Sequence, residues 1–154
     1  LNPLGAKYQI LGTINKSSAQ IMTRILSRIN LKAFNVFYSH NGLDEISLFS
    51  PTTFYIKTNS GIIEKTISNK SYNKYLNKKP NFNDIKGKLP EYNASRLIEL
   101  FSGKKDTYRD MVIINSIYAM MIIKSKLKFN DCFEILTHSI DKGYALKHLE
   151  KLRK

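Results

Sequence analysis

Residues 8–38 read YQILGTINKSSAQIMTRILSRINLKAFNVFY, and this stretch decides the fold class. Its first seven and last six residues are almost continuously apolar, which is typical of strands buried on both faces of a parallel sheet. The helix predicted between them, Ser17 to Ile29, repeats isoleucine at every fourth position from Ile21. Asn15 or Ser17 is available as its cap. A strand, a helix and a strand in succession form a right-handed βαβ unit, so we expect an α/β fold with a mixed, mostly parallel sheet.

The sheet is expected to continue into a β-hairpin. Residues 52–57 and 62–67 resemble strands, and Asn59-Ser60-Gly61 between them supplies turn residues. Residues 68–90 are rich in lysine and asparagine and contain prolines, which predicts an exposed connection with at most a short helical piece.

The carboxyl-terminal half is expected to be helical. The predicted helices cover residues 94–101, residues 107–124, the segment from Asn130 to Gly143, and residues 145–152. The second begins with Thr107-x-x-Asp110, a capping pattern, and is apolar nearly all round. We therefore expect it at the centre of a helical layer. Asn130 is the predicted cap of the third helix.

The composition limits the class of protein. The chain has 154 residues, enough for one domain or one large piece of a larger one. It lacks an apolar run of the roughly 18 residues that a membrane helix needs. The single Cys132 fits a reducing cytoplasm. The chain begins with Leu1 rather than methionine, so we expect a fragment.

The net charge of +13 arises from 25 Lys and Arg against 12 Asp and Glu. Such a charge can indicate phosphate-rich partners such as nucleic acid. Lysine greatly outnumbers arginine, however, and asparagine and isoleucine are also abundant, a combination that AT-rich codons alone would produce. We favour this coding bias over a dedicated nucleic-acid surface.

The segment Asn41-Gly42-Leu43-Asp44-Glu45-Ile46-Ser47 is the most informative candidate site. It follows the second predicted strand, and open α/β sheets bind ligands at the carboxyl ends of their strands. Gly42 allows a tight turn there. Asp44 and Glu45 offer adjacent carboxylates, which suit Mg²⁺ bound through one or two acids and substrate phosphates. A solvated acidic pair without function is the alternative, and His40 is expected to be idle.

The same segment, read as GLDEIS, resembles the anthranilate phosphoribosyltransferase family. Weaker matches occur in the family's order along the whole chain, at Leu1-Asn2-Pro3, Gln9 to Gly12, Pro51-Thr52, Asn93-Ala94, Leu100 to Gly103, and Ile140 to Leu149. The chain departs from the family where Tyr38-Ser39 replaces His-Gly, Ser50 replaces Gly, and Tyr92 replaces Glu.

The resemblance implies an enzyme of tryptophan biosynthesis that transfers the phosphoribosyl group of phosphoribosyl pyrophosphate to anthranilate. It implies that Asp44 and Glu45 hold Mg²⁺ on the pyrophosphate, that Asn2 and Pro3 lie beside the anthranilate channel, and that Gly42 contacts substrate. Residues 1–154 would be the carboxyl-terminal part of the α/β domain of a cytoplasmic homodimer. The phosphate loop and the amino-terminal helical domain would then lie elsewhere, and no catalytic residue is assignable within this chain.

Two other classes stay open at this point. One is a basic nucleic-acid-binding protein, and the other is a degenerate, non-catalytic remnant. A pyrimidine nucleoside phosphorylase of the same broad fold fits GLDEIS less well. Because the neighbouring strands would be missing, we expect the chain alone to be inactive and prone to aggregate.

Overall fold

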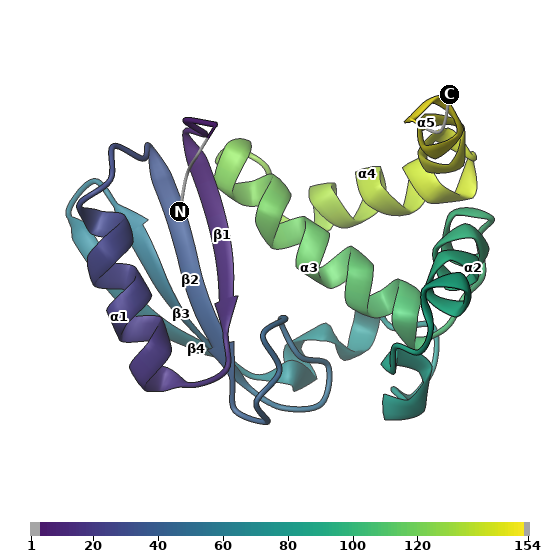
Figure 1. The fold of residues 1–154 in the computed structure, drawn as a ribbon, viewed down its shortest axis with the longest axis horizontal. Coiled ribbons are helices and arrows are strands. Elements are labelled where there is room, and N and C mark those ends of the chain that lie inside the picture. The colour runs from purple at the N-terminus through teal and green to yellow at the C-terminus, as the bar shows by residue number, and fades with distance from the viewer. Residues whose placement is uncertain (1–3, 153–154) are drawn as a thin grey trace.

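The computed structural model describes residues 4–152 and has an α/β architecture (Figure 1). Four strands form one sheet in the order β1-β2-β3-β4. Their bounds are Tyr8–Thr13 for β1, Ala33–Ser39 for β2, Thr52–Thr58 for β3 and Gly61–Ile67 for β4. The expected mixed sheet and hairpin are confirmed. Parallel pairing among the described residues is confined to β1 and β2, because β2–β3 and β3–β4 are antiparallel.

Helices flank the sheet and make up the carboxyl-terminal half, as expected (Figure 1). Their bounds are Lys16–Ser27 for α1, Pro90–Phe101 for α2, Thr107–Ile123 for α3, Phe129–Asp141 for α4 and Tyr144–Leu152 for α5. Two 3₁₀ helices, η1 at Asn69–Tyr75 and η2 at Phe82–Ile85, lie in the connection after β4. Within residues 4–152, no helix is long and apolar enough to cross a membrane.

The two faces of the sheet bury separate apolar clusters. Phe34 and Val36 of β2 face one way and pack with Leu26 of α1. Phe37 of β2 faces the other way and packs with Ile113 of α3. Successive side chains of a strand point to opposite faces, so the apolar run of β2 serves both clusters. The prediction that this strand is buried on both sides is confirmed.

Helix α1 begins at the predicted cap, but the face that it buries differs from the predicted one. Asn15 is its cap, and the Asn15 Oδ1 accepts from the backbone N–H of Ser18 at 2.9 Å. Of the three isoleucines, Ile29 packs against the core cluster with Leu26, as predicted, but Ile21 is 45% exposed and Ile25 37% exposed. The buried face centres on Ala19 and Leu26, which lie two turns apart. Ile21 and Ile25 therefore lie at the edge of the buried face.

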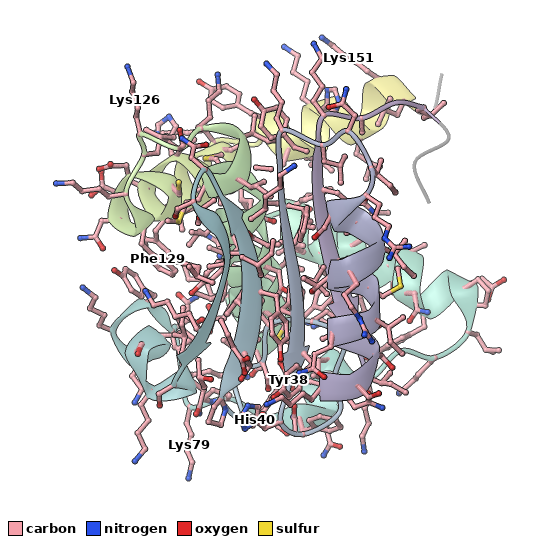
Figure 2. All side chains as sticks on the ribbon, turned by 90° about the vertical axis from the view of Figure 1, so that its left-hand side faces the viewer. Tyr38, His40, Lys79, Lys126, Phe129 and Lys151 are labelled. Carbon is pink, nitrogen blue, oxygen red and sulfur yellow. The ribbon has the colours of Figure 1, made fainter. Side chains whose placement is uncertain are left out.

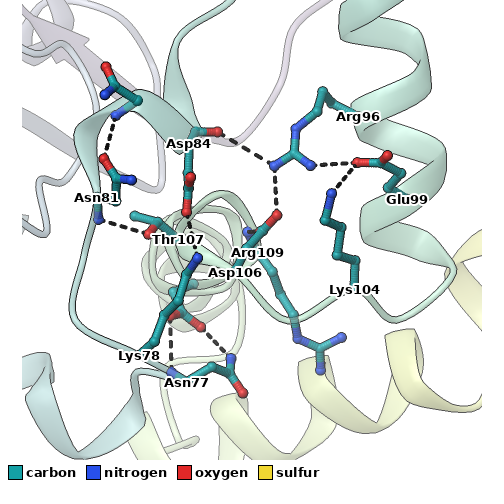
Figure 3. Close-up of polar contacts among 12 residues, drawn as sticks. Asn77, Lys78, Asn81, Asp84, Arg96, Glu99, Lys104, Asp106, Thr107 and Arg109 are labelled. Carbon is teal, nitrogen blue, oxygen red and sulfur yellow. Dashed lines mark hydrogen bonds and ion pairs between the residues drawn. The ribbon is translucent and has the colours of Figure 1, made fainter.

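The predicted cap of α3 is wrong by one residue. Asp106 is the cap, and its Oδ1 accepts from the Arg109 N–H at 3.0 Å. Thr107 holds the preceding connection instead through Asn81 (Figure 3), and Asp110 does so through Asn77. The Thr107 Oγ1 accepts from the Asn81 N–H at 2.9 Å, and the Asp110 carboxylate accepts from the backbone N–H of Asn77 at 3.0 Å. The central position predicted for α3 is confirmed, since it packs on α4, η2, β1 and β2.

The cap predicted for α4 is also wrong. Lys128 is the cap, and its backbone N–H donates to Asp131 at 2.9 Å. Asn130 lies in the first turn, where its side-chain oxygen accepts from the hydroxyl of Tyr75. Asn130 therefore links α4 to η1 and does not cap its own helix. The local sequence pattern does not reveal this role.

The connection at residues 68–90 is exposed over most of its length, as expected, but it is anchored at Tyr72. The buried ring of Tyr72 places its hydroxyl 2.8 Å from that of Tyr118 in α3. This contact and the bonds to the start of α3 hold the connection beside the helical layer.

Candidate functional site

The acidic loop, residues 40–51, leaves the carboxyl end of β2 and folds over the end of β1. Its backbone lies directly against Gly12, where a side chain would collide with the carbonyl group of Asp44. Gly42 adopts a φ of +83° and donates its N–H to the Ser39 carbonyl at 3.0 Å, so the predicted tight turn is confirmed. The parallel β1–β2 pair therefore delivers this loop to the position where open sheets bind ligands.

Asp44 and Glu45 are both exposed in this loop, and Glu45 also lines a cavity of about 340 Å³. The other lining residues are Leu43, Ile85, Tyr108, Met111, Val112 and Asn115. Partial desolvation raises the pKa of the Glu45 carboxyl above its ordinary value, and the hydrogen bond and charge of Asp44 raise that pKa further. The two carboxyl groups are thus close enough to repel when both are ionised, and a cation would relieve that repulsion.

Ser39 fixes the loop from the sheet side. Its Oγ donates to the carbonyl oxygen of Glu45 at 2.6 Å and accepts from the N–H of Ser47 at 3.1 Å. The Thr52 Oγ1 lies 2.8 Å from the same hydroxyl and also accepts from Ser47 at 3.2 Å. All three side chains are buried. Ser39 stands where the resembled family has the glycine of His-Gly. Its hydroxyl therefore makes hydrogen bonds that glycine could not.

Asn115 of α3 fixes the loop from the helix side. Its amide exchanges two hydrogen bonds with the backbone of Ile46, the residue after Glu45. The sequence analysis did not identify Asn115 as a functional residue. The available signal was an amide side chain within the mostly apolar helix α3.

His40 does not join the acidic pair. Its Nε2 lies 2.9 Å from the Thr53 Oγ1 on β3, and its ring stacks on Tyr38 with centroids 5.3 Å apart. Figure 2 shows Tyr38 and His40 at one end of the sheet and Lys126 near the opposite end. An apolar groove of about 770 Å³ that Lys126 helps to line therefore lies far from the acidic loop.

Asp44 and Glu45 are the two carboxylates that the acidic loop offers to an ion. Residues 4–152 hold no group of three or more His, Cys, Asp or Glu side chains placed to bind a metal. Two adjacent acids fit Mg²⁺, which keeps several waters and takes its remaining ligands from substrate phosphates. Asn2 and Pro3, predicted to contact substrate, lie outside the described residues.

Comparison with known families supports the expected resemblance. The profile described as "Glycosyl transferase family, a/b domain" matches residues 1–146. The chain belongs to this family. The match covers the four-stranded sheet of the chain, its acidic loop and helices α1 to α4, so the likeness does not rest on the GLDEIS segment alone.

Curated relatives of this a/b domain are anthranilate phosphoribosyltransferases. The one from Ruminiclostridium cellulolyticum is 29% identical over 152 residues, which is 97% of this chain and 43% of the relative. The one from Methanococcoides burtonii is 31% identical over 98% of this chain and 42% of the relative. The chain thus spans about two fifths of the length of the relatives it matches.

Solved structures agree on the fold. Anthranilate phosphoribosyltransferase from Saccharomyces cerevisiae in complex with 4-fluoroanthranilate superposes with a TM-score of 0.82 at 20% identity, over 94% of this chain and 41% of that one. The same yeast enzyme in complex with PRPP and Mg gives a TM-score of 0.81 at 19% identity. The expected α/β fold is confirmed by these superpositions.

Proposed function

We propose that the chain supplies the metal-binding edge of an anthranilate phosphoribosyltransferase. The observation that carries the proposal is the acidic loop, because Gly12, Ser39 and Asn115 hold it at the carboxyl ends of the parallel β1–β2 pair. Asp44 and Glu45 would hold Mg²⁺, and Gly42 would let the loop backbone approach the phosphates. The names of the relatives and the yeast complex with PRPP and Mg support this assignment.

In the proposed reaction the amine of anthranilate displaces pyrophosphate from the ribose carbon of phosphoribosyl pyrophosphate. Asp44 and Glu45 would hold Mg²⁺, which would supply positive charge to neutralise and orient the leaving pyrophosphate. The loop would fix the position of the leaving pyrophosphate. Position matters because a nucleophile reacts fastest when it is held in line with the carbon it attacks. The fixed peptide group between Glu45 and Ile46 serves that need.

The rest of the site would lie outside this chain. We infer that residues 1–154 are the carboxyl-terminal part of the α/β domain, with Asn2 and Pro3 beside the anthranilate channel. The phosphate-binding loop and the helical domain that forms a homodimer would belong to the remaining three fifths of the enzyme. A cytoplasmic location stays a prediction.

The double variant Asp44→Asn, Glu45→Gln tests the proposal when the chain is joined to the amino-terminal portion. We expect at least a hundredfold loss of transferase rate, about 2.7 kcal/mol of barrier, and a raised Mg²⁺ requirement. The matched control is Glu134→Gln with Glu150→Gln, which makes the same charge change at exposed positions of α4 and α5. Near-normal turnover in the double variant would remove the metal assignment.

The same assay separates the two remaining alternatives. A degenerate remnant would show no transferase activity even when it is joined to the amino-terminal portion. A nucleic-acid-binding protein would instead bind RNA with an affinity that falls steeply with salt, because neutralised phosphates release counterions. The family match supports the transferase over both.

A further inference from the structure

Asn115 lies in a mostly apolar part of α3, and both ends of its amide reach a loop 69 residues away in sequence. Its Oδ1 accepts from the Ile46 N–H at 2.8 Å. Its Nδ2 donates to the Ile46 carbonyl at 3.1 Å and to the Met111 carbonyl at 2.9 Å. The side chain thus pairs with Ile46 as a neighbouring strand would, while its bond to Met111 fixes the amide on the helix.

The place of this bond matters more than its strength. Ile46 follows Glu45 directly, and its side chain is fully buried. On the sheet side, Ser39 accepts the Ser47 N–H and donates to the Glu45 carbonyl. From the helical layer, Asn115 binds the N–H and the carbonyl of Ile46. The backbone after the acidic pair is therefore hydrogen-bonded both to the sheet and to α3. This fixes the backbone from which the side chains of Asp44 and Glu45 extend.

We propose that Asn115 is the positioning residue of the acidic pair, and that its bonds to Ile46 set the affinity of Asp44 and Glu45 for a divalent cation. The inference rests on the proposed function, because it takes the pair to be the metal-binding part of the site. Groups that orient metal ligands without touching the ion typically change metal affinity by about 10- to 100-fold when they are removed. A residue that only stabilised the fold would lower the melting temperature and leave that affinity unchanged.

The test is a Mn²⁺ titration, followed by electron paramagnetic resonance, of the chain joined to the amino-terminal portion, with and without inorganic pyrophosphate. Asn115→Leu removes the two bonds to Ile46 and the bond to Met111 without adding charge, and it keeps the number of side-chain heavy atoms. Asn115→Ala, which cannot overfill the site, is the second variant. We expect both to weaken Mn²⁺ binding by about tenfold or more. The matched control is Tyr118→Phe, which removes the buried hydroxyl pair with Tyr72 from the same helix. It should lower the melting temperature and leave Mn²⁺ affinity unchanged.

Hydrogen exchange of the Ile46 amide is the second measurement. We expect exchange to accelerate in Asn115→Leu and to stay slow in Tyr118→Phe. Unaltered Mn²⁺ affinity in Asn115→Leu, alongside lost affinity in Asp44→Asn with Glu45→Gln, would overturn the inference and leave the proposed function standing. Unaltered affinity in that acidic double variant would count against the proposed function instead. The inference would then fail with the proposed function, because it concerns the cation affinity of that pair. An unchanged exchange rate of the Ile46 amide in Asn115→Leu would overturn the inference by itself.

Discussion

The backbone of Gly12 in β1 touches the carbonyl group of Asp44, so closely that a Cβ atom on Gly12 would lie 1.5 Å from the carbonyl oxygen and 2.5 Å from its carbon. Both obstructing atoms belong to the backbone, so no rotamer change can make room. The glycine therefore sets the height of the acidic loop above the end of β1.

Gly12→Ala should displace this loop. Overpacking of this kind costs about 1–3 kcal/mol, and a shift of the acidic pair by about 1 Å can lower the transferase rate about a hundredfold. Urea denaturation and transferase assays of the complete enzyme measure the two effects. Gly87→Ala is the matched control, since its Cβ would meet nothing closer than 3.6 Å. Equal behaviour of the two variants would show that the loop adjusts freely.

Ser39→Ala should loosen the sheet side of the same loop. The substitution removes the donor to Glu45 and one acceptor for Ser47, in a place where water does not substitute. We expect the free energy of unfolding to fall by about 1–3 kcal/mol, measured by urea denaturation. Ser71→Ala, at an exposed serine of η1, should stay within about 0.5 kcal/mol of the unaltered chain. A neutral Ser39→Ala would mean that Thr52 alone holds Ser47.

Arg109 and Asp141 form an ion pair with unequal burial. The Arg109 Nη2 lies 2.7 Å from Asp141, and the arginine is 2% exposed while the carboxylate side chain is 45% exposed. Within the described residues, the Nε and Nη1 of Arg109 have no hydrogen-bond partner. The pair is therefore incompletely compensated on the arginine side.

This asymmetry predicts opposite outcomes for the two partners. Asp141→Asn leaves a buried guanidinium without its carboxylate and should destabilise the chain by about 1.5–3 kcal/mol, the range of hydrogen bonds to charged groups. Arg109→Met removes the buried charge, and the half-exposed Asp141 can then be hydrated, so the free energy of unfolding should change little or rise. Thermal and urea denaturation compare the two. A larger loss in Arg109→Met would show that its unpaired nitrogens do find partners.

Exposed apolar surface predicts self-association of the chain by itself. Strand β1 is an edge of the sheet, Ile21 and Ile25 are partly exposed on α1, and Met120 and Ile123 line the groove near α4. Edge strands and apolar patches of this kind favour association. Sedimentation velocity should detect oligomers that co-expression with the amino-terminal portion removes.

A paired substitution locates the surface responsible. Ile21→Glu with Ile25→Glu should raise the monomer fraction, whereas Leu152→Glu, at an exposed leucine near the end of α5, should not. A single monomeric species with a cooperative thermal transition in the unaltered chain would contradict the expectation.

The sequence by itself determined the order of the elements and the place of the candidate site. Local patterns suffice for that, since continuous apolar runs indicate buried strands, Asn59-Ser60-Gly61 indicates a hairpin turn, and Gly42 next to the acidic pair indicates a ligand loop. These signals are short-range, because burial and turn geometry act on neighbouring residues.

Only the tertiary structure decided how the acidic loop is held. Gly12 meets Asp44, Ser39 bonds to Ser47, and Asn115 reaches Ile46 across 69 residues of sequence. Tertiary contacts also moved the caps of α3 and α4, because Thr107 and Asn130 serve other elements. A polar side chain in sequence carries no mark of which distant partner will satisfy it, and the partner exists only once the sheet and α3 pack together.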